Sequence, residues 1–176
     1  MNSKLITPGF LLITGMILFA AFIRLIPHPP NFTPVAAMAL FGGAYFNKKW
    51  MAFLIPLTAM FLSDLVIGFH SGMWAVYLSL ILITIIGMIF IKRKKASNII
   101  LASVTASVLF FIITNFAVWA AGIYYPKTLS GLALCYTAAI PFFHYTLLGD
   151  LFFVGVMFGL YHLIAHRYPA LAKSTV

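Results

Sequence analysis

The residues that could do chemistry in this chain are few. Asp64 and Asp150 are the two acidic residues among 176. An ionisable side chain is costly in hydrocarbon unless it is paired or hydrated, so each acid marks either a structural pair or a binding site. The polar and aromatic side chains expected at similar depth are Arg24, His28, Asn31, Phe32, His70, Asn115, Trp119 and His144. A water-accessible cavity for a small polar molecule would explain this grouping.

A purely structural explanation accounts for the same residues. Arg24 can neutralise Asp64, and the histidines can rest at the lipid headgroup boundary. Asp150 can bond to Asn115 or to a backbone group. Both interpretations stay open at this point. The candidate substrate-binding residues are Asn31, Phe32, Asp64, His70, Asn115, Trp119, His144 and Asp150.

Motifs typical of enzymes and metal sites are missing from the sequence. It has no HExxH, no GxSxG and no glycine-rich phosphate loop. His162 and His166 have an i,i+4 spacing, but they lie beside Arg167 at a predicted membrane boundary, which favours an interfacial role. Cys135 is the single cysteine, so an intramolecular disulfide and a multi-cysteine metal site are excluded. We expect no catalysis, no metal and no cofactor.

The composition predicts that lipid, rather than water, surrounds most of the chain. Hydrophobic residues make up 64% of the sequence and charged residues 7%, against about a quarter charged in soluble domains. The net charge of +9 could suggest nucleic acid. Its cations, however, sit between apolar runs rather than in polar stripes that could follow phosphates, so nucleic-acid binding is excluded.

The apolar runs predict one all-α membrane domain, residues 1–176, with about six transmembrane helices. They cover about 8–26, 33–46, 50–68, 74–91, 97–122 and 140–164. The second run would span only about 21 Å as a helix, so it must be poorly tilted, thin the bilayer or be shielded by its neighbours. The segment 123–140 contains Pro126 and Gly131 and is predicted to be an interfacial loop; a seventh span there is the alternative.

The Lys and Arg residues predict the orientation, because cytoplasmic loops retain positive charge. Nine fall on one side of six spans: Lys4, Lys48, Lys49, Lys92, Arg93, Lys94, Lys95, Arg167 and Lys173. Arg24 and Lys127 fall on the other, so both termini are predicted to be cytoplasmic. Asp64 and Asp150 then lie roughly 6 and 15 Å below the outer surface. The first run could instead be a secretory signal, but removing it would spoil the charge asymmetry.

The segment between the first two runs is rich in proline. Pro29, Pro30 and Pro34 stiffen this outer loop, so Asn31 and Phe32 can be held at the mouth of a cavity at little further entropic cost. The loop is therefore predicted to act as a lid over a ligand.

Small residues follow this loop in the second run. Ala36, Ala39 and Gly43 form a surface that allows another helix to approach closely, and the last two have the small-xxx-small spacing. The surface fits either internal packing or an interface with a partner protein.

Four stretches carry a resemblance to known proteins: RLIPHPPNFTPVAAMALFGGAYF, LSDLVIGFH, TNFAVWAAGIYYP and CYTAAIPFFHYTLLGD. They resemble a family of small bacterial integral membrane proteins of uncharacterised function. More distantly, that family is similar to the substrate-binding S components of energy-coupling factor vitamin transporters. The resemblance implies an S-component-like bundle of six helices in the bacterial inner membrane, with an outward-facing pocket capped by loops. It also implies a small-residue face that meets a membrane-embedded coupling subunit with ATPases.

The function expected from these observations is transport. The chain would bind a small organic molecule, such as a vitamin or precursor, at the outer face for uptake, without catalysing a reaction. One alternative is a membrane scaffold or assembly partner that binds no ligand. Another is an intramembrane enzyme that uses Asp64 or Asp150 with a histidine. A cavity that opens outward favours transport, whereas a closed and dry bundle favours the scaffold.

Overall fold

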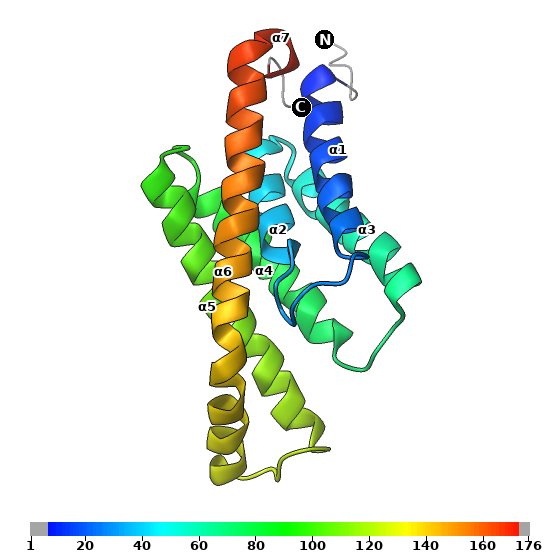
Figure 1. The fold of residues 1–176 in the computed structure, drawn as a ribbon, viewed down its shortest axis with the longest axis vertical. Coiled ribbons are helices and arrows are strands. Elements are labelled where there is room, and N and C mark those ends of the chain that lie inside the picture. The colour runs from blue at the N-terminus through cyan, green and yellow to red at the C-terminus, as the bar shows by residue number, and fades with distance from the viewer. Residues whose placement is uncertain (1–6, 173–176) are drawn as a thin grey trace.

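A computed structural model describes residues 7–172, and this part of the chain consists of helices and loops without strands. Lys4 and Lys173, which contributed to the charge count, lie outside the described residues. The helices are α1 (Pro8–Ile23), α2 (Val35–Tyr45), α3 (Lys49–Ile67), α4 (Met73–Phe90), α5 (Ala96–Ala121), α6 (Leu129–Arg167) and the short α7 (Pro169–Ala172). Figure 1 shows α1 and α3–α6 arranged around α2.

Four helices, α3, α4, α5 and α6, are long and apolar enough to cross a membrane, whereas α1 and α2 are shorter. Many large side chains on the outside of the bundle are apolar, for example Leu65, Ile89 and Phe152, each about half exposed or more. An apolar outer surface over helices of this length is typical of a protein whose surroundings are lipid. The chain is therefore a helical membrane protein.

Helix α2 is the centre of the bundle. Ten of its eleven residues are buried, and it packs against α1, α3, α4, α5 and α6. A helix of this length covers about 16 Å, roughly half of the hydrocarbon thickness. Of the three explanations for a short second run, shielding by neighbouring helices is the one that the structure supports.

The closest packing of the bundle joins α2 to α4. A Cβ on Gly43 would lie 2.3 Å from the Thr84 carbonyl oxygen, and a Cβ on Gly87 would lie 2.6 Å from that of Leu40. Ala36 and Ala39 are also buried. The predicted partner interface at Ala36, Ala39 and Gly43 is therefore wrong, because this small-residue surface is fully used inside the chain.

The longest helix corrects a second prediction. The sixth span was expected at 140–164 after an interfacial loop, but α6 is continuous over its 39 residues and the loop is confined to 122–128. The Thr128 hydroxyl caps the helix by accepting from the Gly131 backbone N–H at 3.1 Å. Gly131 does not break the helix: it lies so close to the Pro126 carbonyl that a Cβ would not fit. Pro141 lies within the helix, as prolines do in membrane helices whose freed backbone groups find other partners.

The loops divide between the two ends of the bundle. At one end the loop 91–95 lies close to the end of α2, with the Lys94 ammonium 4.8 Å from the centroid of the Tyr45 ring. The long loop 24–34 and the loop 68–72 lie toward the opposite end (Figure 1). The α5–α6 hairpin extends past both of these loops, so its two helices form a wall beside them (Figure 1).

Candidate functional site

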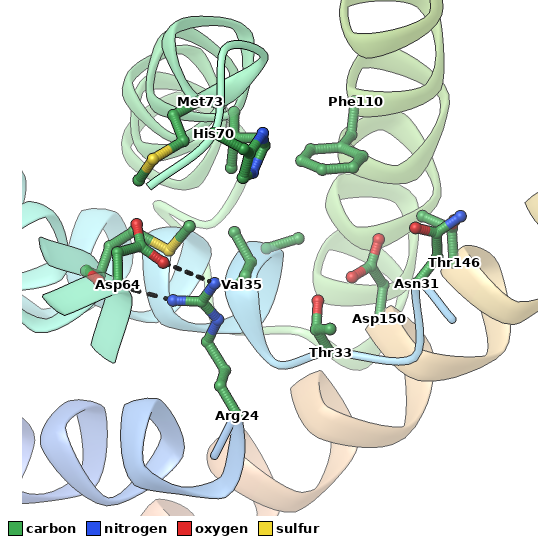
Figure 2. Close-up of a pocket in the computed structure, with 13 residues that line it drawn as sticks. Arg24, Asn31, Thr33, Val35, Asp64, His70, Met73, Phe110, Thr146 and Asp150 are labelled. Carbon is green, nitrogen blue, oxygen red and sulfur yellow. Dashed lines mark hydrogen bonds and ion pairs between the residues drawn. The ribbon is translucent and has the colours of Figure 1, made fainter. Parts of the chain in front are cut away.

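Four of the eight predicted binding residues line one cavity of about 140 Å³. Asn31 comes from the α1–α2 loop, Asp64 from the end of α3, His70 from the α3–α4 loop and Asp150 from the middle of α6. The rest of the lining is Arg24, Thr33, Val35, Ala36, Met60, Met73, Val76, Phe110 and Thr146. Figure 2 shows these side chains converging from separate helices and loops. We call this space the acidic cavity.

The acidic cavity has a buried floor and an exposed mouth. Asp64 and Asp150 are 3% and 4% exposed. Asn31 and His70 are exposed and belong to the loops at the same end of the bundle. Water or a solute that enters between these loops can therefore reach both carboxyl groups.

Both oxygens of the Asp64 carboxylate are occupied by partners. One accepts from the Arg24 guanidinium at 2.9 Å, and the other accepts from the Tyr77 hydroxyl at 2.8 Å. Arg24 also donates to the Ser63 hydroxyl and, at 3.5 Å, to the Met60 carbonyl. This network ties the end of α1 to α3 and α4. For Asp64, the structural explanation predicted from the sequence is what the structure contains.

Asp150 has a different environment. Its Oδ2 lies 2.6 Å from the Ser107 hydroxyl on α5, and no cation of residues 7–172 lies within ion-pair distance of it. Asn115, a predicted partner, instead donates to the Phe111 carbonyl at 2.8 Å. Asp150 is thus a buried acid that faces a cavity without a counter-charge.

The proline-rich loop is fixed against α6 by Phe32. Its ring lies 5.8 and 5.5 Å from the ring centroids of Phe152 and Phe153. The loop approaches α6 closely at Gly149, where an added Cβ would lie only 3.0 Å from the Phe32 Cα. Asn31 adopts a left-handed backbone conformation with φ 64°, which asparagine tolerates better than most residues. Phe32 therefore anchors the loop, and Asn31 is the residue of the pair that lines the cavity.

A second cavity of about 360 Å³ adjoins the first. The two share Asn31, His70, Val76, Phe110 and Thr146. The second is bordered by Asn115 and by aromatic rings from the α5–α6 hairpin, which are Phe111, Phe142 and Phe143. We call it the aromatic cavity. Asn115 is therefore close to the predicted site, but not beside the acids.

Besides Phe32, two predicted residues line neither cavity. The Trp119 indole N–H donates to the Pro126 carbonyl at 3.1 Å, which holds the α5–α6 loop. His144 is exposed, with its ring 4.0 Å from that of Tyr145. Both residues were predicted from depth alone, and the depth of a helical residue does not determine which way its side chain faces.

Sequence reasoning missed several hydroxyl groups at the site, above all Ser107, Thr33, Thr146 and Tyr77. For one of these residues, Ser107, the sequence contained a signal. Ser103 and Ser107 are spaced i,i+4 and both are buried, so they form a short polar stripe on one buried face of α5. Such a stripe indicates a polar group on the facing helix.

A larger cavity, of about 700 Å³, lies toward the other end of the bundle between α5 and α6. Lys94 and His162 are at its edge, and it contains no carboxylate and none of the predicted binding residues. Among residues 7–172 no group of three or more His, Cys, Asp or Glu side chains could hold a metal ion. The chemically distinctive site is therefore the smaller acidic cavity with its aromatic neighbour.

Comparisons with known proteins place the chain in a family. Searches of curated proteins and of solved structures gave no match. A family model described as a family of unknown function, DUF6580, matches residues 4–171. The match covers nearly the whole chain, including every residue of both cavities. The chain therefore belongs to DUF6580, a family of unknown function.

Proposed function

We propose that this chain binds a small organic molecule at the outer face of a bacterial inner membrane and serves as the substrate-binding subunit for its uptake. The observation that carries the proposal is the acidic cavity, where residues from four separate segments meet beneath two exposed loops. A bundle that served only for packing would have no need of a buried, uncompensated acid facing a cavity. The site has no evident catalytic pair, so binding without chemistry is the function that fits it best.

The proposed orientation follows from the charged residues. Lys48 and the run 92–95 lie in loops away from the acidic cavity, Lys49 begins α3 there, and Arg167 ends α6 there. If that end faces the cytoplasm, the acidic cavity opens outward, and six crossings place both termini inside. This arrangement is like that of the S components to which the sequence bears a distant resemblance. A coupling subunit with ATPases would have to dock on a surface other than Ala36, Ala39 and Gly43, because these residues are buried.

Native mass spectrometry of gently purified protein tests this proposal. We expect a small molecule to copurify with the wild-type chain. Thr146→Phe should abolish its retention, because Thr146 lines both cavities and the larger side chain obstructs the place where they meet. Thr137→Phe is the matched control: Thr137 is exposed on the same helix and should leave retention unchanged. Asn31→Gly, at the exposed mouth, is a milder change that should weaken retention without disturbing the fold, because glycine accepts the positive φ of this position.

Two outcomes would contradict uptake. Copurification of another protein but never of a small molecule would support the scaffold alternative. Equal retention by Thr146→Phe, with the protein folded, would place the ligand outside these cavities.

A further inference from the structure

The charges around the acidic cavity do not balance. Arg24 and Asp64 form an ion pair and cancel each other. The remaining acid, Asp150, is 4% exposed and lacks a cationic partner within the described residues. The other titratable groups near the cavity are His70 at the mouth and Tyr77 behind Asp64, whereas α5 and α2 bring only Ser103, Ser107 and apolar residues to this region. An ionised Asp150 therefore leaves the cavity with one uncompensated negative charge.

From this imbalance we propose that the site selects an organic ammonium ion, with the cationic head at Asp150 and an apolar or aromatic body in the aromatic cavity. This inference rests on the proposed function and specifies its substrate class. It excludes neutral and anionic molecules as preferred ligands.

The other groups lining the acidic cavity suit an ammonium head. Figure 2 shows Thr33, Asn31 and Thr146 on the same side of the cavity as Asp150. Their oxygens can accept the N–H groups that the carboxylate does not bind. Phe110 lines both cavities, and the face of an aromatic ring attracts a cation. A head of this kind would therefore be bound by one charge, several acceptors and one ring.

The second cavity suits the body of such a molecule. Phe111, Phe142 and Phe143 border it, and it joins the acidic cavity through shared lining residues. Its volume of about 360 Å³ is larger than that of the acidic cavity. Stacking against these rings would add binding energy without a charge. The ligand is therefore expected to have one cationic end and one ring or short hydrocarbon end.

The empty site needs a proton in place of the cation. The Ser107 hydroxyl oxygen lies 2.6 Å from Asp150 Oδ2 and 3.0 Å from the Ser103 carbonyl oxygen. A hydroxyl has one hydrogen, so it cannot donate fully to both acceptors. If Asp150 is protonated, its O–H donates to Ser107 and Ser107 donates to Ser103, which satisfies every contact. Binding then exchanges one ion for another: the ammonium enters, the O–H bond of Asp150 breaks, and one proton leaves to water.

The test uses three probes with one body: phenethylammonium, phenethyl alcohol and phenylacetate. We expect phenethylammonium to raise the melting temperature of the full chain in detergent, and the alcohol and the carboxylate to leave it unchanged. Asp150→Asn should abolish the shift. The Ser107→Ala variant should bind with altered pH dependence. The matched control is Thr105→Ala, on the same helix, which removes an exposed hydroxyl bonded only to the Leu101 carbonyl and should behave as wild type.

Proton exchange provides a second measurement. Each rise of one pH unit should lower the apparent Kd for phenethylammonium about tenfold, as long as the empty site carries its proton. His70 is an ionisable side chain that also lines the cavity. The titration is therefore repeated in His70→Gln, where the dependence on Asp150 should persist.

The outcomes separate this inference from the function on which it rests. A shift with phenethyl alcohol or phenylacetate but not with phenethylammonium would overturn the charge selectivity and leave small-molecule capture intact. An undiminished ammonium shift in Asp150→Asn would overturn the role of Asp150. No shift with any probe, together with no copurified small molecule in native mass spectrometry, would overturn both proposals.

Discussion

The two carboxyl groups of this protein lie in the wall of one cavity but have opposite environments. Asp64 is bound by the Arg24 guanidinium and the Tyr77 hydroxyl, so both of its oxygens have partners. Asp150 is hydrogen-bonded to the Ser107 hydroxyl through Oδ2. Its carboxyl group also lines the cavity, where it can form further hydrogen bonds. The same residue type at the same burial therefore has two different environments. One acid holds helices together, and the other lines the cavity without a cationic partner among residues 7–172.

The largest expected effect comes from breaking the ion pair. Asp64→Asn strands the Arg24 guanidinium and should lower the free energy of unfolding by about 3–5 kcal/mol. Arg24→Gln should cost a similar amount because it strands Asp64. The double variant should be less damaging than the sum of the two, which is the signature of direct coupling. Unfolding by denaturant titration in detergent measures all three, and strictly additive losses would show that the pair is not coupled.

A smaller effect is expected from the second partner of Asp64. Tyr77→Phe removes the hydroxyl that donates to Oδ2 and should cost about 1.5–3 kcal/mol, as hydrogen bonds to charged groups do. Tyr136→Phe is the matched control, since its hydroxyl donates to the neutral Ile112 carbonyl, and should cost about 0.5–1.5 kcal/mol. If both variants lose the same free energy of unfolding in the same titration, the charge of Asp64 does not strengthen the Tyr77 hydrogen bond.

The smallest effect on stability is expected at Asp150. Asp150→Asn removes no ion pair, and the amide N–H can donate to Ser107 as the Asp150 O–H does in the empty site, so the ligand-free protein should lose less than about 1 kcal/mol. The check is the same unfolding titration beside Asp64→Asn. A loss as large as that of Asp64→Asn would remove the contrast between the two acids and assign Asp150 a structural role.

The central helix was only partly predictable. Its length and its small residues, Ala36, Ala39 and Gly43, indicated close packing. The sequence did not show whether this surface packs against a partner chain or against a helix of the same chain, because the residue pattern of one helix does not identify the helix that packs against it. Gly87, whose missing Cβ makes room for Leu40, is the complementary feature, and it is separated from Gly43 by more than forty residues.

The amino-acid sequence by itself determined that this is a helical membrane protein, because apolar runs of this length with so few charges have no other stable environment. It also identified the two acids and the loops that approach them, since charges in such a chain are too costly to be incidental. Only the tertiary structure decided which acid is paired. The partners of Asp64 come from α1 and α4, and the partner of Asp150 comes from α5. Side-chain direction around a helix and the choice of neighbouring helix are set by packing of the whole bundle. For this reason Trp119 and His144, at a suitable depth, do not line the two cavities, whereas Thr146 lines both.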